Sequence, residues 1–259
     1  MDNHAVNAAR SIYYGFFSKM FVFTPNIDRF EGVDEALDIL IKNPLDENSG
    51  EALKEIKEFI KTYGNQGLSD EFDDIFNNPV TQTVRDTASF YSEGVESGRK
   101  RVEVKNFLAK TRIRRNEKVF TDNEDSIGFL VTFMHELIEL VSSGEKQYET
   151  VEHCLYTEVI NEFFDEFIVA LYEHDKANAY KSLAIVLNAF IEFERLYYKV
   201  QKPKAKEKIQ KKEEEMKEVI SDAEAKRRSE NRKKREGDLL HSSCKLDDVF
   251  TGTEEEGDL

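Results

Sequence analysis

Histidine and carboxylate side chains occur in several arrangements that start like metal sites, and each arrangement lacks a necessary ligand. His135-Glu136 begins like the zinc-protease motif, but the residue four after His135 is Glu139 instead of a second histidine. A di-iron bundle needs Glu-x-x-His on two helices. None of His135, His153 and His174 has a glutamate three residues before it. The sequence therefore predicts no catalytic metal site.

The sequence also lacks the usual motifs for nucleophilic catalysis and for phosphate binding. Cys154 follows His153, but adjacent side chains on a helix diverge by about 100°. Glu158, Glu162 and Glu166 share one helix face, a spacing more typical of a hydrated surface than of a metal cage. The sequence has no glycine-rich phosphate loop. We predict a binding protein with no cofactor, and an enzyme that acts on nucleotides is the weakest alternative.

The spacing of apolar residues predicts helices along nearly the whole chain. The first helix has apolar residues at steps of three and four, and Thr24-Pro25-Asn26 ends it because proline disfavours helical geometry in the residue before it. The fold class is therefore all-α, a single helical bundle. Further helices are expected at about 32–42, 49–63, 69–77, 82–96, 99–111, 123–142, 146–172 and 177–199.

The stretch 111–125 interrupts this pattern and divides the predicted bundle into two halves. It has no apolar stripe, so we expect a connection and a possible hinge. Thr121 and Glu124 have capping-box spacing just before the strongest helix. Ser49 is the predicted N-cap of the helix that it begins.

Charge is distributed unevenly along the chain. The formal net charge is −15, of which residues 201–259 contribute −1. The predicted domain 1–200 is therefore acidic, which argues against nucleic acid as a partner and favours a basic peptide, although acidity also serves solubility. Residues 201–235 carry +6 and are predicted to form a charged helical extension; residues 236–259 carry −7 and are predicted to be a disordered acidic tail.

The chain shows no sign of export or membrane insertion. MDNHAVNAAR lacks the basic and apolar regions of a signal peptide, and the longest apolar run is far short of the roughly 20 residues that span a bilayer. Cys154 and Cys244 match no metal or redox spacing, which is typical of a reduced compartment. We predict a cytoplasmic protein, monomeric or dimeric.

Four segments together resemble the TorD/DmsD/NarJ family of redox-enzyme maturation chaperones. The resemblance covers about residues 5–195. Asn123-Glu124-Asp125-Ser126-Ile127 resembles a family segment that often carries histidine where this chain has Ser126. The other three are the first helix, with Arg10-x-x-x-Tyr14; Phe72-x-x-Ile75-Phe76-x-x-Pro79; and Ser89-Phe90-Tyr91.

The resemblance implies a cytoplasmic, non-catalytic chaperone for a molybdenum or tungsten oxidoreductase, such as a formate dehydrogenase or an anaerobic reductase. It would bind the twin-arginine signal peptide or the apo-enzyme until the cofactor is inserted and the client is exported. Asp125, with Asn123, Glu124 and Ser126 nearby, is the expected arginine receptor. The expected apolar groove, near Ser89, is lined by Phe76, Pro79, Phe90 and Tyr91, and for Phe76 and Phe90 a place in the core is equally consistent.

Two points stay open at this stage. Arg112, Arg114 and Arg115 would oppose a dibasic ligand, and they could instead meet an acidic client surface or a phosphate-bearing cofactor. The alternative function is a helical scaffold that acts through the charged tail 201–259. The other interpretation of this tail is a solvated appendage without a binding role.

Overall fold

The computed structural model of the protein describes residues 3–24, 27–117 and 120–203. Regular secondary structure in these residues is helical throughout, apart from one isolated β-bridge, which confirms the all-α prediction. None of the described helices is long and apolar enough to cross a membrane. The predicted acidic tail (236–259) and all but the first three residues of the predicted helical extension (201–235) lie outside the described residues.

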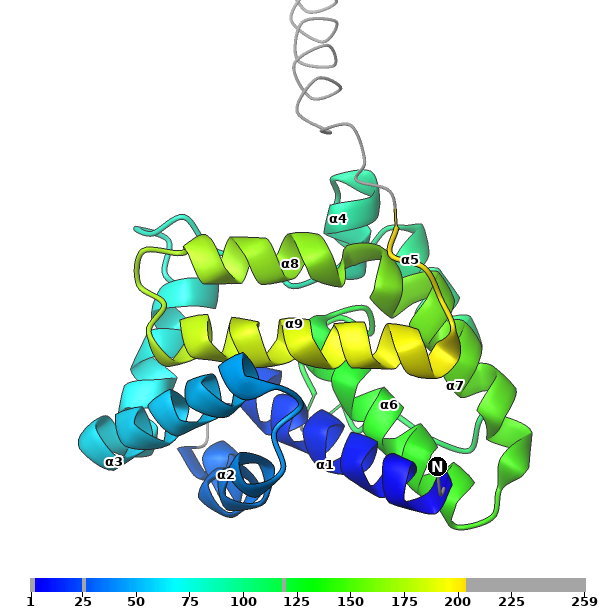
Figure 1. Ribbon diagram of the computed structural model, residues 1–259. Coiled ribbons are helices and arrows are strands. Elements are labelled where there is room, and N and C mark those ends of the chain that lie inside the picture. Colours follow the sequence, from blue (N-terminus) through cyan, green and yellow to red (C-terminus); the bar gives the residue numbers. More distant parts are fainter. Residues whose placement is uncertain (1–2, 25–26, 118–119, 204–259) are drawn as a thin grey trace, which may run out of the picture. The chain divides into compact units, whose positions relative to one another are not determined.

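Two sets of packed helices build the bundle (Figure 1). In one set, α9 (Ala179–Tyr198) lies between α3 (Glu47–Phe76) and α8 (Asn161–Glu173). In the other, α1 (Asn3–Phe21) runs beside α6 (Ile127–Ser142). The other elements are η1 (Ile27–Phe30), α2 (Val33–Lys42), α4 (Ala88–Glu93), α5 (Arg99–Ala109), η2 (Lys146–Tyr148), α7 (Glu149–Leu155) and the π-helical turn η3 (Tyr156–Ile160).

Aromatic rings fill the contact between α1 and α9. Phe190 of α9 has ring centroids of Tyr13, Tyr14 and Phe17 within 4.9–5.4 Å, and all four side chains are buried. Because aromatic side chains bury large apolar areas, this cluster supplies the bulk that tryptophan would otherwise provide.

A buried ion-pair network ties the first helix to the last. Arg10 of α1 donates to Glu194 of α9 at 2.6 Å and pairs with Glu152 of α7 at 2.8 Å. Tyr14, one turn after Arg10, donates its hydroxyl to the same Glu194 at 2.8 Å. The spacing of Arg10 and Tyr14 thus places both side chains on one face of α1, where one carboxylate accepts from both.

The predicted helices at 49–63 and 69–77 join into the single element α3. Gly64 interrupts it with a positive φ of 65°, which glycine adopts without steric cost. The helix also begins earlier than predicted, because Asp46 is the N-cap and Ser49 lies one turn inside. The Asp46 carboxylate accepts from Ser49 N at 2.7 Å, and Ser49 Oγ accepts from Asp46 N at 3.0 Å, in a reciprocal capping box.

The prediction of a helix over 82–96 is wrong at both ends, because only Ala88–Glu93 is helical. The preceding residues pair with the distant connection instead. Ala88 N donates to Asp125 O at 2.9 Å, Ile127 N donates to Asp86 O at 2.8 Å, and Thr87 forms a β-bridge with Ser126. These long-range hydrogen bonds replace the local helical ones.

The described part of 111–125 is non-helical, as predicted, but the capping box expected after it is wrong. Helix α6 begins at Ile127, with Ser126 as its N-cap accepting from Phe129 N at 3.3 Å. Glu124 does not cap the helix, because its carboxylate pairs with Arg101 and Arg115. Movement of the connection as a hinge stays a prediction.

The predicted helices at 146–172 and 177–199 are present with smaller differences. The first is divided into η2, α7, η3 and α8, and the second is α9. Residues up to Pro203 make up one compact unit.

Candidate functional site

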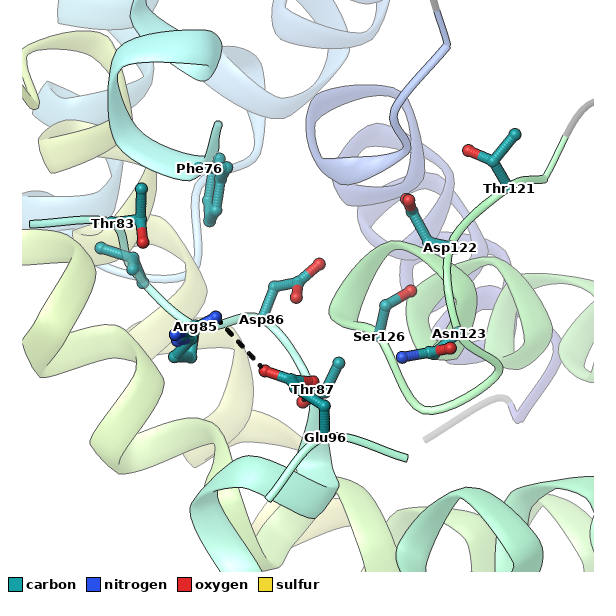
Figure 2. Close-up of a pocket in the computed structure, with 11 residues that line it drawn as sticks. Phe76, Thr83, Arg85, Asp86, Thr87, Glu96, Thr121, Asp122, Asn123 and Ser126 are labelled. Carbon is teal, nitrogen blue, oxygen red and sulfur yellow. Dashed lines mark hydrogen bonds and ion pairs between the residues drawn. The ribbon is translucent and has the colours of Figure 1, made fainter. Parts of the chain in front are cut away.

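A cavity of about 330 Å³ opens where the segment before α4 meets the connection before α6 (Figure 2). Asp86 and Thr87 come from the first segment, while Asp122, Asn123 and Ser126 come from the second. The β-bridge and its flanking backbone hydrogen bonds hold the two walls together. The full lining is Phe76, Thr83, Val84, Arg85, Asp86, Thr87, Glu96, Thr121, Asp122, Asn123 and Ser126; we call it the acidic pocket.

Three carboxylates give the acidic pocket its character. Burial raises the pKa of Asp86 to about 7, and the nearby negative charges of Asp122 and Glu96 add to the shift. Burial also raises the pKa of Asp122, although the Phe23 backbone N–H and the charge of Arg115 oppose this. Among the described residues, no ion pair includes Asp86 or Asp122. A cation in this pocket would relieve their mutual repulsion.

Glu96 differs from the other two carboxylates because it has partners from its own wall. Thr87 Oγ1 donates to Glu96 at 2.6 Å, and Arg85 Nη1 lies 3.7 Å from the Glu96 carboxylate. The Arg85 guanidinium also lies 5.5 Å from the centroid of the Phe90 ring. This arginine is half exposed, so its long contact with Glu96 contributes little to stability and can exchange for another cation.

Asp125 is fully buried and is not among the residues that line the pocket. Its Oδ2 accepts from the backbone N of Ser89 at 2.9 Å and from the Ser89 hydroxyl, which fastens the start of α4 to the connection. Its Oδ1 has no hydrogen-bond partner among the described residues. The Asp125 charge nevertheless reaches the pocket, since it contributes to the raised pKa of Asp86.

Glu124 takes part in a network of hydrogen bonds and ion pairs that links the connection to α5. Its carboxylate accepts from Arg101 Nε at 2.6 Å and pairs with Arg115 at 2.8 Å, while Arg101 N donates to Ser89 Oγ at 3.3 Å. Burial alone raises the pKa of Glu124, but the hydrogen bonds from Arg101 and Arg115 hold it below its usual range. Asp125 joins the same network because its carboxylate accepts hydrogen bonds from Ser89, whose hydroxyl accepts from Arg101 N.

The predicted apolar residues fall at several places around the pocket. Phe76 lines it and also contacts the rings of Phe72 and Phe167, so it belongs to both the pocket and the core. Phe90 is half-buried, and Pro79 is exposed. Tyr91 is buried, and its hydroxyl donates to Arg85 O at 2.8 Å.

Of the residues predicted for the site, Phe76, Asn123 and Ser126 line the acidic pocket, whereas Asp125, Glu124 and Ser89 form the scaffold around it. The carboxylates that line the pocket, Asp86, Glu96 and Asp122, were not among the predicted residues. Asp122 directly precedes the predicted motif, so its place in the sequence was a usable signal. Asp86 and Glu96 were hidden by the expectation of a continuous helix over 82–96.

Comparison with known sequences places the chain in a family. Residues 42–169 match the model of the nitrate reductase delta subunit family. The chain belongs to this NarJ/TorD-type chaperone family. The resemblance seen in the four motifs is therefore confirmed, and the protein is a maturation chaperone for a redox enzyme.

Structure comparison gives a weaker likeness. The crystal structure of a candidate redox enzyme maturation protein from Archaeoglobus fulgidus is 16% identical, with a TM-score of 0.45. The match covers 71% of this chain and 93% of that chain. No curated protein sequence is significantly similar to this NarJ/TorD-type chaperone.

Proposed function

We propose that this chaperone binds the twin-arginine signal peptide, or the apo form, of a molybdenum or tungsten oxidoreductase such as a formate dehydrogenase or an anaerobic reductase. It holds this client in the cytoplasm until the cofactor is inserted and export can begin. The observation that carries the proposal is the acidic pocket, where Asp86 and Asp122 face one cavity and neither forms an ion pair within the described part of the chain.

Arginine suits this pocket because its planar guanidinium presents five donors and keeps its charge at every relevant pH. One ligand arginine would lie between Asp86 and Asp122, which come from opposite walls (Figure 2). The second would take the place of Arg85 at Glu96, where the existing contact is long and half exposed. A dibasic sequence is thus matched by three carboxylates.

In this proposal, apolar side chains within a few residues of these carboxylates in the sequence bind the apolar part of a signal peptide. Val95 directly precedes Glu96 and is about half exposed, and Val80 is 90% exposed. Phe90 packs under Arg85 and is only half-buried.

Asp125 contributes to binding mainly as a positioning residue in this proposal. Its carboxylate holds Ser89, and its backbone carbonyl accepts from Ala88 N, so it fixes the wall that carries Asp86. Direct contact between Asp125 and a ligand arginine requires the pocket to open further.

Isothermal titration calorimetry tests the proposal with a synthetic peptide in which Arg-Arg precedes an apolar segment. We expect Asp86→Asn/Asp122→Asn to weaken binding by about tenfold or more, because paired charges in a partly dehydrated site contribute strongly to affinity. Asp175→Asn, a change of one exposed carboxylate between α8 and α9, serves as the control and should leave the affinity unchanged.

A peptide with Lys-Lys in place of Arg-Arg should bind more weakly, because lysine cannot make the bidentate contact. If the double variant binds the Arg-Arg peptide as tightly as the wild type does, the acidic pocket is not the receptor.

A further inference from the structure

A second and larger cavity, of about 500 Å³, lies at the other end of the connection that carries Asp122. Its polar rim comes from the residues that follow α5, and its apolar wall comes from α6. The lining residues are Arg112, Ile113, Arg114, Arg115, Asn116, Phe120, Phe129, Thr132, Phe133, Glu136 and Leu140; we call it the basic pocket.

The basic pocket has the opposite charge to the acidic pocket. Three arginines and one carboxylate, Glu136, line it. Its wall is aromatic: the Phe120 ring contacts Phe129 at 5.6 Å edge to face, and Phe129 contacts Phe133 at 6.1 Å. The cavity thus combines cations at the surface with an apolar interior.

The three arginines are not equally available to a ligand. Arg115 pairs with Glu124 at 2.8 Å, so it already belongs to the ion-pair network around Glu124. Arg112 pairs with Glu145 at 2.6 Å but is 64% exposed, and exposed pairs of this kind exchange at little cost. Arg114 is exposed and donates only to the carbonyl oxygens of Thr111 and Ile113; among the described residues, no carboxylate pairs with it.

We infer that the basic pocket is a second docking site for the client, which takes an acidic segment with an apolar side chain. A carboxylate of this segment binds Arg114 and displaces Glu145 from Arg112, while the apolar side chain enters the cavity against Phe120. Charge complementarity carries the choice of an acidic occupant. The inference rests on the proposed function only in taking the ligand to be a client polypeptide.

The chain connectivity favours a polypeptide over a small anion. The residues 111–126 contribute lining to both pockets, with Arg114 and Phe120 in one and Asp122 and Asn123 in the other. A ligand that uses two oppositely charged pockets on one connection needs a basic part and an acidic part separated by a spacer. A polypeptide has this form, and two separate contacts on one chain raise the overall affinity through effective concentration.

Fluorescence anisotropy on the full chain tests the inference with a labelled peptide that alternates Glu and Asp with Leu and Phe. We expect Arg114→Glu to weaken binding about tenfold, because it replaces the arginine by a residue with the same negative charge as the peptide. Lys105→Glu makes the same charge change on the exposed face of α5 and should alter the affinity by less than about twofold. Arg114→Gln should give an intermediate loss.

Three outcomes would overturn the inference. Equal affinities for Arg114→Glu and Lys105→Glu would show that only the net charge matters. Equal binding of a peptide with Gln and Asn in place of Glu and Asp would remove the electrostatic argument. Binding of adenosine triphosphate, but not of the acidic peptide, in an Arg114-dependent manner would identify a phosphate site instead.

The Arg-Arg peptide, titrated into the same variants, separates this inference from the proposed function. Arg114→Glu should retain affinity for the Arg-Arg peptide, and Asp86→Asn should retain affinity for the acidic peptide. If each variant loses affinity for only one of the two peptides, the two pockets are assigned independently. Thermal melts monitored by circular dichroism check that each variant is folded.

Discussion

Asp86 is the residue whose surroundings most strongly support the proposed binding site. Its carboxyl shares a cavity with Asp122 and Glu96, and the cost of charging it there raises its pKa to about 7. Ionised Asp86 destabilises the folded state, and carboxylates with raised pKa values are found often at functional sites.

Replacing this side chain should therefore stabilise the chaperone in a pH-dependent way. The pKa of Asp86 is higher in the folded state than its ordinary value of 3.8, so its contribution to folding is favourable at low pH and is lost as the pH rises through about 7. Asp86→Asn removes the charge penalty. We expect the gain in unfolding free energy at pH 8 to exceed the gain at pH 4.5 by about 1–3 kcal/mol, since one pKa unit corresponds to about 1.4 kcal/mol and partial hydration reduces the full effect.

Chemical denaturation at the two pH values measures this difference, with Asp175→Asn as the control that should show no pH dependence. An equal effect of Asp86→Asn at both pH values would mean that Asp86 ionises normally in the folded protein.

At the scale of elements, the start of α9 depends on a side chain from another helix. Glu71 of α3 accepts hydrogen bonds from the backbone N–H groups of Asn178, Ala179 and Tyr180 at 2.7–3.1 Å. The Asn178 side chain makes no cap of its own. A carboxylate at this position also interacts favourably with the helix dipole.

We expect Glu71→Ala to destabilise the fold by about 2 kcal/mol, because it leaves up to three N–H groups without acceptors, and two of them belong to the buried residues Ala179 and Tyr180. The midpoint of urea unfolding measures the loss. Asp70→Ala, one residue earlier and exposed, is the control and should cost much less. Similar losses for the two variants would show that water or a rearranged turn replaces Glu71 as the cap.

For the molecule as a whole, the excess of negative charge and the titration of Asp86 act together on a basic ligand. The net charge of −15 attracts such a peptide over a distance that salt shortens. If the acidic pocket is the receptor, it should bind such a peptide most strongly once Asp86 has lost its proton.

The affinity for the Arg-Arg peptide should therefore rise about three- to tenfold between pH 6 and pH 8, as Asp86 ionises with a pKa of about 7. It should also fall with added salt. Calorimetric titrations over this range provide the measurement, and Asp86→Asn should remove most of the pH dependence. An affinity that decreases from pH 6 to pH 8 would contradict the electrostatic basis of the proposal.

Several features of this protein follow from its sequence alone. The 3.6-residue periodicity identified the helices that bury an apolar face, such as α1 and α9, because one stripe of apolar residues has a single favourable partner, the core. The lack of any stripe over 111–125 marked the connection. The order of the four motifs was enough to indicate the family, which the match over 42–169 then confirmed.

Tertiary structure decided which residues form the pocket. Residues 82–87 look helical in isolation, but the backbone groups of residues 86–88 pair with residues 125–127, far along the chain. This pairing turns Asp86 toward Asp122 and leaves Asp125 buried on Ser89. A local pattern records which face of a helix is apolar, whereas hydrogen bonds between distant segments depend on how the helices pack. The carboxylates of the acidic pocket therefore meet only in the folded chain.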